Sequence, residues 1–343
     1  MRRGRQMYDV IAASAVYECM TLMPNNGPVL TTADAQEYYD DAVRALILQG
    51  FAPKRARRFP RMTLYLHPGL TPAEIKLAKE SGIVTGVKFY PKNPIHGTTG
   101  AEYSVPSLTD IPREVFESLN EHQLHLLLHG ESASHDRILE LEAHFVKEQL
   151  AWIVEEYPGL PISLEHVTSK AGVDFVMRAP PNVTATITPQ HLLHTFDSLF
   201  EGGLRAFRYC LPLYKHPEDR AALIEAATSG NPKFCCGDDT APHPKHGSSP
   251  KSAKLVDCGC AGAFVAPVSI PLYTAVFERV GALDDRFEAF MSRNGAIARS
   301  WPLSDDDIII ERRPWTVPDD YPYADNVVVP FCAGEELAWQ VAA

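Results

Sequence analysis

The stretch Leu124-His-Leu-Leu-Leu-His-Gly-Glu131 is the clearest indication of the fold in this 343-residue chain. An apolar run of strand length ends there in His129, a side chain that can take part in chemistry. Short apolar runs of this kind, bounded by polar residues, predict buried β-strands. Seven such runs recur along the chain: residues 19–23, 62–66, 86–90, 124–128, 162–164, 183–187 and 233–236.

Helical patterns fill the intervals between these runs. The expected helices are residues 32–48, 72–79 and 137–157, with two more, 272–280 and 286–294, after the last strand. Thr71 is expected to cap the second of them, and Glu74 to complete a capping box with it. Strands that alternate with helices predict a parallel sheet built from βαβ units.

We therefore expect an α/β fold of the (β/α)8 TIM-barrel type. Hydrophobic residues make up 45% of the chain, enough to bury one large core, so residues 1–343 are predicted to form a single domain. Residues 320–343 are expected to pack on the barrel as a C-terminal tail. Such a barrel has eight strands, whereas seven are found, so the first strand is predicted to precede Met1.

Composition narrows the classes of function. The formal charge of −11 disfavours nucleic acid and anionic membranes as partners, since both favour basic surfaces, and it suits a small-molecule enzyme. No run of about 18 apolar residues is present that would span a bilayer. The seven cysteines are an odd number and are interpreted as reduced thiols, which favours a cytoplasmic protein.

Polar residues follow the predicted strands at the points where the strands end. In a barrel of alternating strands and helices, the carboxyl ends of the strands meet at one face, where the active site lies. Residues far apart in the sequence are therefore expected to converge on one site. The set is Asn25, His67, Lys88, His129, His166, Thr188 with Gln190, and Asp239.

Histidine and carboxylate side chains in this set are the kinds that ligate a transition metal. Lys88 stands out, because an ammonium group has no lone pair and ligates a metal only after conversion to an anion. Taken alone, a lysine at this position is expected to form a salt bridge or to extend its charged end toward water.

Seven segments together resemble the dihydroorotases of the single-domain bacterial and fungal type, in the amidohydrolase superfamily. They occur in the family's order, and the similarity extends from Arg2 to residues 329–334. The segments are Gly86-Val-Lys-Phe-Tyr-Pro91, Leu127-Leu-His-Gly-Glu131, Leu164-Glu-His-Val-Thr168, Ala185-Thr-Ile-Thr-Pro-Gln-His-Leu192, Tyr209-Cys-Leu-Pro212, Gly237-Asp-Asp-Thr-Ala-Pro-His243 and Gly259-Cys-Ala-Gly262.

The resemblance implies a zinc site and a set of substrate contacts. Lys88 would carry a carbamate, formed from carbon dioxide, that bridges two Zn²⁺ ions. His129 and His166 would hold one ion, and Asp239 would bind the other and act as the general base and acid. The substrate carboxylate would be bound by Arg2, Asn25, His243 and the backbone of Ala261 and Gly262, and the backbone of Leu211 would contact the pyrimidine ring.

The implied reaction is the reversible cyclisation of N-carbamoyl-L-aspartate to (S)-dihydroorotate and water, the third step of de novo pyrimidine biosynthesis. The family commonly forms homodimers, so a homodimer is expected. Two alternatives remain open: a noncatalytic homologue that binds or scaffolds a partner, and a related amidohydrolase that acts on a hydantoin or a dihydropyrimidine. A carboxylate-binding set disfavours neutral rings.

The sequence departs from the family pattern in three places. A His-X-His pair that binds one zinc is expected directly before the arginine matched by Arg2, where only Met1 stands, so we expect this sequence to be short at its N-terminus. Thr98 and Thr99, expected to form the substrate lid, are displaced by a few residues. Asp238 adds a second carboxylate beside Asp239, which would raise the pKa of its neighbour if both faced the site.

Overall fold

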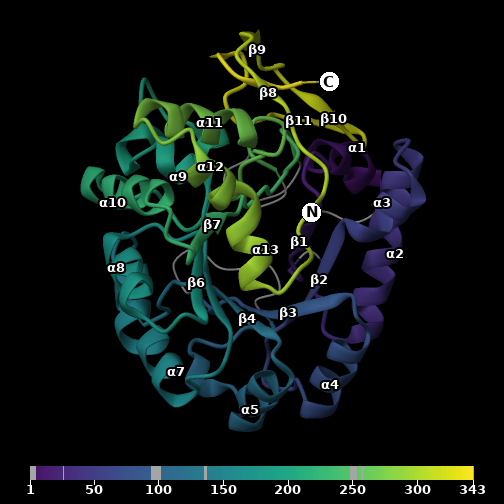
Figure 1. Cartoon of the computed structure of the whole chain (residues 1–343), viewed down its shortest axis with the longest axis vertical. Helices are drawn as coiled ribbons and strands as arrows, with labels where there is room; N and C mark the ends of the chain where they lie inside the picture. Colours follow the sequence, from purple (N-terminus) through teal and green to yellow (C-terminus); the bar gives the residue numbers. More distant parts are fainter. Residues whose placement is uncertain are drawn as a thin grey trace.

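The strands form one curled, wholly parallel sheet in which each strand pairs with the next along the chain (Figure 1). The computed structural model describes residues 5–25, 27–93, 102–134, 137–247, 253–255 and 259–342. All seven predicted strands are found, and the predicted α/β barrel fold is confirmed. They are β1 (Met20–Leu22), β2 (Pro60–Tyr65), β3 (Val84–Phe89), β4 (His125–His129), β5 (Ile162–Glu165), β6 (Val183–Ile187) and β7 (Phe234–Cys236).

Helices cover the outer face of this sheet (Figure 1). The predicted helix 32–48 is found with these bounds, whereas the one expected at 137–157 begins at Leu141 and passes through a π-helical turn, Val146–Leu150, before α7. The helices are α1 (Arg5–Ser14), α2 (Thr32–Leu48), α3 (Pro53–Arg58), α4 (Pro72–Glu80), α5 (Arg113–His122), α6 (Leu141–Phe145), α7 (Ala151–Glu156), α8 (Lys170–Arg178), α9 (Pro189–Leu193), α10 (Pro217–Thr228), α11 (Ser269–Arg279), α12 (Asp285–Glu288) and α13 (Asn294–Ala298).

The start of α4 corrects one detail of the expected capping. Thr71 caps the helix as predicted, and its hydroxyl accepts a hydrogen bond from the amide of Glu74 at 3.2 Å. The Glu74 carboxylate, however, accepts from the amide of Thr32 at 2.6 Å instead of closing a capping box. This carboxylate therefore joins the first turn of α4 to the first turn of α2.

Strand alternation determines which side chains enter the barrel. Successive side chains of a strand point to opposite faces, so residues two apart share a face. Along β4, Leu126 and Leu128 pack in the main core, whereas His129 lies on the opposite face and lines the interior cavity. On β3, Phe89 likewise packs in the core and Lys88 faces inward.

The register of the sheet brings the ends of three strands to one level. Lys88 of β3 pairs with Leu127 of β4, and His129 at the end of β4 pairs with Glu165 at the end of β5. The polar residues at these strand ends are therefore neighbours in space.

Three short antiparallel ribbons form the C-terminal segment, drawn in yellow in Figure 1. Tyr323 donates a hydrogen bond to the carbonyl of Pro242 at 3.0 Å, and Phe331 pairs through its amide with Phe264. The segment thus packs on the loop that follows β7. The ribbons pair β8 (Ile310–Glu311) with β13 (Gln340–Val341), β9 (Trp315–Thr316) with β12 (Glu336–Leu337), and β10 (Tyr321–Tyr323) with β11 (Asn326–Val328).

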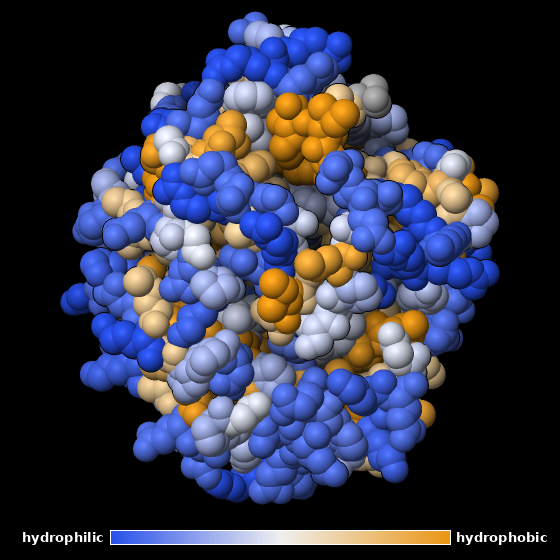
Figure 2. Space-filling model, in the orientation of Figure 1, coloured by the Kyte–Doolittle hydropathy of each residue, from blue (hydrophilic) through white to orange (hydrophobic). Residues whose placement is uncertain are grey.

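The surface seen in Figure 2 is largely hydrophilic, with hydrophobic residues in small separate groups and a recess above the centre of this face. In the part of the chain that the structure describes, no helix combines the length and the apolar character needed to cross a membrane.

Candidate active site

A cavity of about 1600 Å³ opens at the carboxyl ends of the strands. Most of the residues singled out from the sequence line it, although they are spread over more than 200 positions of the chain. Those that line it are Asn25, Lys88, His129, His166, Leu211, Asp239, His243, Ala261 and Gly262. Arg2, Thr98 and Thr99 lie outside the described residues. The structure thus brings these nine residues together, while the role of each remains a prediction. His67, Thr188 and Gln190, which were expected at the same face, do not line the cavity.

Lys88 is buried at the end of β3. Its Nζ lies 5.2 Å from the centre of the Tyr90 ring and has no hydrogen-bond partner among the described residues. Burial lowers the pKa of Lys88, although the carboxylates of Glu165 and Asp239 act in the opposite direction. The uncharged amine is therefore more accessible here than on a lysine in water.

The rings of His129 and His166 line the cavity next to each other, with centres 4.8 Å apart and planes inclined at 65°. Nε2 of His129 lies 2.7 Å from Oε2 of Glu131, a contact that fixes the orientation of the ring. His166 has a positive φ of 43° and donates its amide to the Thr186 hydroxyl at 2.7 Å. Its Nδ1 is buried and has no hydrogen-bond partner on any other described residue.

Asp239 follows β7 and also has a positive φ, 46°. Left-handed backbone at a residue other than glycine is uncommon and concentrates at functional sites. Desolvation by the surrounding protein raises the pKa of Asp239, and Lys88 opposes this rise. Asp238 also raises that pKa, with a smaller effect than desolvation or Lys88, and its side chain accepts a hydrogen bond from the hydroxyl of Tyr17 at 3.0 Å.

Gly262 lies where a side chain has no room. Its φ is +143°, and a Cβ built on it would lie 2.7 Å from the Cβ of Ala241 and 2.9 Å from Cδ2 of His243. Its amide already donates to the carbonyl of Tyr209 at 2.9 Å. Gly262 thereby brings its own segment against the neighbouring segment that carries Leu211.

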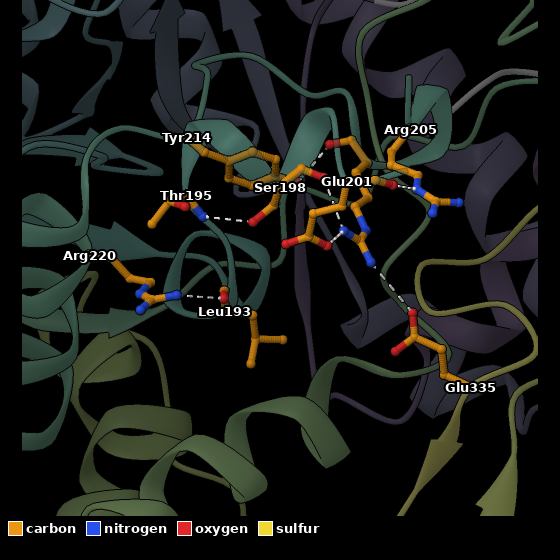
Figure 3. Close-up of polar contacts among 9 residues, drawn as sticks. Leu193, Thr195, Ser198, Glu201, Arg205, Tyr214, Arg220 and Glu335 are labelled. Carbon is orange, nitrogen blue, oxygen red and sulfur yellow. Dashed lines mark hydrogen bonds and ion pairs between the residues drawn. The ribbon is translucent and has the colours of Figure 1, made fainter. Parts of the chain in front are cut away.

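A network centred on Arg208 holds the loop before Leu211. Figure 3 labels its partners Ser198, Glu201, Tyr214 and Glu335. Nη1 of Arg208 donates to the carbonyl of Ser198 at 3.0 Å and to Glu201 at 2.7 Å. Nη2 lies 3.9 Å from Glu335 of the C-terminal segment, and Tyr214 donates its hydroxyl to the Arg208 carbonyl at 2.7 Å. The loop is therefore tied to both the barrel and the C-terminal segment.

Several residues of the site were not singled out from the sequence. Glu165, at the end of β5, forms a buried ion pair with Arg299 at 3.2 Å and accepts from the Thr186 hydroxyl. Glu131 stands two residues after His129, a spacing that could have suggested a carboxylate to orient that histidine. Arg299 is 134 positions away from its partner, and nothing in the sequence connects the two.

Metal ligands are available in part. The described residues contain no group of three or more histidine, cysteine, aspartate or glutamate side chains arranged to hold a metal ion. His129 and His166 supply two imidazole rings, and a third ligand would have to come from a modified Lys88. The buried Nζ of Lys88 and Nδ1 of His166, each without a hydrogen-bond partner on another described residue, are consistent with such a site.

A curled parallel sheet with a cavity at its carboxyl edge is the architecture of the barrel enzymes, whose active sites lie at that face. A solved D-hydantoinase shares the fold, with a TM-score of 0.72 and 14% sequence identity over 99% of this chain and 79% of that one. Dihydroorotase from Campylobacter jejuni superposes with a TM-score of 0.82 at 27% identity, over 100% of this chain and 93% of that one. Dihydroorotase from Saccharomyces cerevisiae, solved with 5-fluoroorotic acid, gives 0.85 at 29% identity, over 99% and 94%.

The chain belongs to the dihydroorotase family. It is 40% identical to the dihydroorotase of Alkalilimnicola ehrlichii, over 99% of this chain and 95% of that protein. It is 43% identical to that of a Picosynechococcus species, over 94% and 88%, and 39% identical to the mitochondrial dihydroorotase of rice, over 96% and 80%. No family model matches the sequence.

Proposed function

We propose that the protein catalyses the reversible cyclisation of N-carbamoyl-L-aspartate to (S)-dihydroorotate and water, the third step of pyrimidine biosynthesis. One observation carries the proposal. In a chain of the dihydroorotase family, a single cavity collects Lys88, His129, His166 and Asp239 from the ends of separate strands.

Asp239 is the proposed general base and acid. In the hydrolytic direction its carboxylate accepts a proton from water, whose oxygen bonds to the ring carbonyl carbon. The bond from that carbon to the ring nitrogen then breaks, and Asp239 returns the proton to the nitrogen. Asp239 lines the same cavity as Lys88 and Glu165, where a carboxylate can take up a proton and release it in turn.

Lys88, His129 and His166 are the proposed ligands of a zinc ion. The uncharged amine of Lys88 adds to carbon dioxide and loses a proton, which leaves a carbamate anion at the end of the side chain. Burial supports this step because it favours the uncharged amine. A bound Zn²⁺ ion would polarise the carbonyl under attack and lower the pKa of water. A second zinc, with Asp239 among its ligands, completes the proposal.

The substrate carboxylate is assigned to a clamp at the rim of the cavity. Asn25 and His243 line the cavity and can donate hydrogen bonds to the substrate carboxylate. The backbone of Ala261 lines the same cavity. The amide of Gly262 is engaged with Tyr209, so the contribution of Gly262 is to the shape of the clamp. Arg2 is proposed as the charged member of the clamp, and Thr98 and Thr99 as its lid.

A related amidohydrolase acting on a hydantoin or a dihydropyrimidine is the alternative within this fold. Such rings lack the carboxylate of dihydroorotate, and the polar side chains of Asn25 and His243 at the rim would then have no anionic partner. We further propose a homodimer in the cytoplasm as the working form.

The test compares dihydroorotate with dihydrouracil as substrates of the full-length protein. We expect turnover of dihydroorotate and, in the reverse direction, of N-carbamoyl-L-aspartate, with little turnover of dihydrouracil. Asp239→Asn should abolish both directions, since it removes the proton carrier. Preference for dihydrouracil would refute the assignment and favour the alternative.

A further inference from the structure

Lys254 is a buried lysine beside the clamp, and the mechanism above does not use it. Its side chain is only 5% exposed. Its Nζ donates to the carbonyls of Tyr209, Cys260 and Gly262, each at 2.9 Å. An ammonium group has three donors, and all three are used. A buried charge is tolerated only when it is hydrogen-bonded in this way.

The three carbonyls belong to two segments that form one wall of the cavity. Tyr209 lies two residues before Leu211, and Cys260 and Gly262 flank Ala261. The amide of Gly262 adds a direct bond between the same segments, at 2.9 Å to Tyr209. The ammonium therefore stands at the junction of the part of the wall assigned to the ring and the part assigned to the carboxylate.

The backbone around Lys254 links this junction to the loop after β7. The amide of Lys254 donates to the carbonyl of Pro244, the residue after His243, at 2.9 Å. The amide of Cys260 donates to the carbonyl of Ala253, also at 2.9 Å. The segments that carry Leu211, His243 and Ala261 are thus all held by hydrogen bonds to residues 253–254.

We propose that Lys254 is a positioning residue of the substrate clamp. It fixes the spacing between the Leu211 segment and the Ala261 segment, and so sets affinity for a ring that bears a carboxylate without touching the substrate. The inference rests on the proposed function, because it concerns the same site. Replacing the ammonium with an apolar group would remove this donor from the carbonyls of Cys260 and Gly262 and leave the carbonyl of Tyr209 with the amide of Gly262.

Lys254→Met is the main test, because methionine has similar length and volume but no donors. We expect the KM for dihydroorotate to rise about tenfold or more while kcat changes far less, since misplaced binding groups weaken positioning before chemistry. Lys254→Arg retains the charge and should recover part of the loss.

Lys233→Met provides a matched control. Nζ of Lys233 also donates to three backbone carbonyls, of Val176, Met177 and Ala179, where α8 ends. These contacts lie at the opposite end of the sheet from the cavity, at the entrance to β7. The Lys233→Met substitution should lower the melting temperature and leave the KM for dihydroorotate unchanged.

Hydrogen exchange at the amide of Gly262 gives a readout independent of activity, and it should be faster in Lys254→Met than in the wild type. An unchanged KM together with unchanged exchange would overturn the positioning role alone. A well-folded wild type that fails to turn over dihydroorotate would instead overturn the proposed function. In that case the exchange rate still decides whether Lys254 joins the two segments.

Discussion

At the scale of single residues, some residues of the site could be predicted from their place at a strand end, whereas others are recognised only in the folded structure. His166 and Asp239 could be found from the sequence because each follows an apolar run, and Lys88 because it interrupts one near its end. Lys254 could not, since its three acceptors lie on segments with no strand pattern. Arg299 could not be predicted for a related reason, because its partner Glu165 is distant in the sequence.

Gly262→Ala should impair the clamp. The added Cβ would meet Ala241 at 2.7 Å on a backbone of φ +143°, so the segment must shift. We expect a KM for dihydroorotate about tenfold higher, because small displacements of binding groups are costly. Steady-state kinetics measures this. Gly281→Ala is the control, since φ is +68° there with nothing within 4 Å, and only about 1 kcal/mol of stability should be lost. Equal kinetics in both variants would contradict the prediction.

Glu131→Gln should weaken the proposed zinc site. The carboxylate lies 2.7 Å from Nε2 of His129 and orients that ring, and loss of such a partner typically lowers metal affinity about 10–100-fold. Competition with a chelator gives the zinc affinity directly. Glu140→Gln, at a half-exposed glutamate that pairs with Arg137, should leave that affinity as it was. Unchanged zinc affinity in Glu131→Gln would show that the Glu131 carboxylate has no role in zinc binding.

At the scale of elements, the sequence pattern was sufficient to predict the seven strands and the helices at 32–48 and 72–79, but it was not sufficient to predict side-chain capping. Thr71 and Glu74 have capping-box spacing, yet Glu74 binds the amide of Thr32. Glu74 binds Thr32 because α2 packs close to α4, and a local sequence pattern carries no information on such packing. The helix expected at 137–157 starts later for a similar reason: its first residues form a turn before Leu141.

Glu74→Ala should lower the free energy of unfolding by about 1–2 kcal/mol, because a charge-assisted hydrogen bond between two helices is lost. Chemical denaturation measures the change, and kinetic constants should stay the same. Thr71→Ser retains the cap of α4 and is expected to unfold like the wild type. A loss in Thr71→Ser as large as that in Glu74→Ala would argue against a separate role for the link to α2.

At the scale of the whole molecule, buried histidines tie stability to pH. His191 is fully enclosed, with ring nitrogens near the Thr188 hydroxyl at 2.6 Å and the Pro212 carbonyl at 2.9 Å. Burial lowers the pKa of His191 from 6.5 to about 4. The unfolded chain therefore binds a proton at a higher pH than the folded one. The stability due to neutral His191 is present above pH 6.5 and is lost as the pH falls toward 4.

We expect this histidine alone to remove about 2 kcal/mol of unfolding free energy between pH 7 and pH 5. His191→Gln keeps a polar side chain that does not titrate, so its stability should fall less steeply over the same interval. Denaturant unfolding at both pH values measures the two slopes. Parallel slopes in wild type and variant would show that other groups govern the acid limit.

The sequential order of the sheet, from β1 to β7 with each strand beside its predecessor, bears on how the protein is made. Each βα unit can dock on the preceding one as it leaves the ribosome, because its partner has already been synthesised. The catalytic centre cannot form at the same pace. Asp239 and the segment at Gly262 emerge after all seven strands β1 to β7, so a nascent chain acquires a folded scaffold before it acquires an active site.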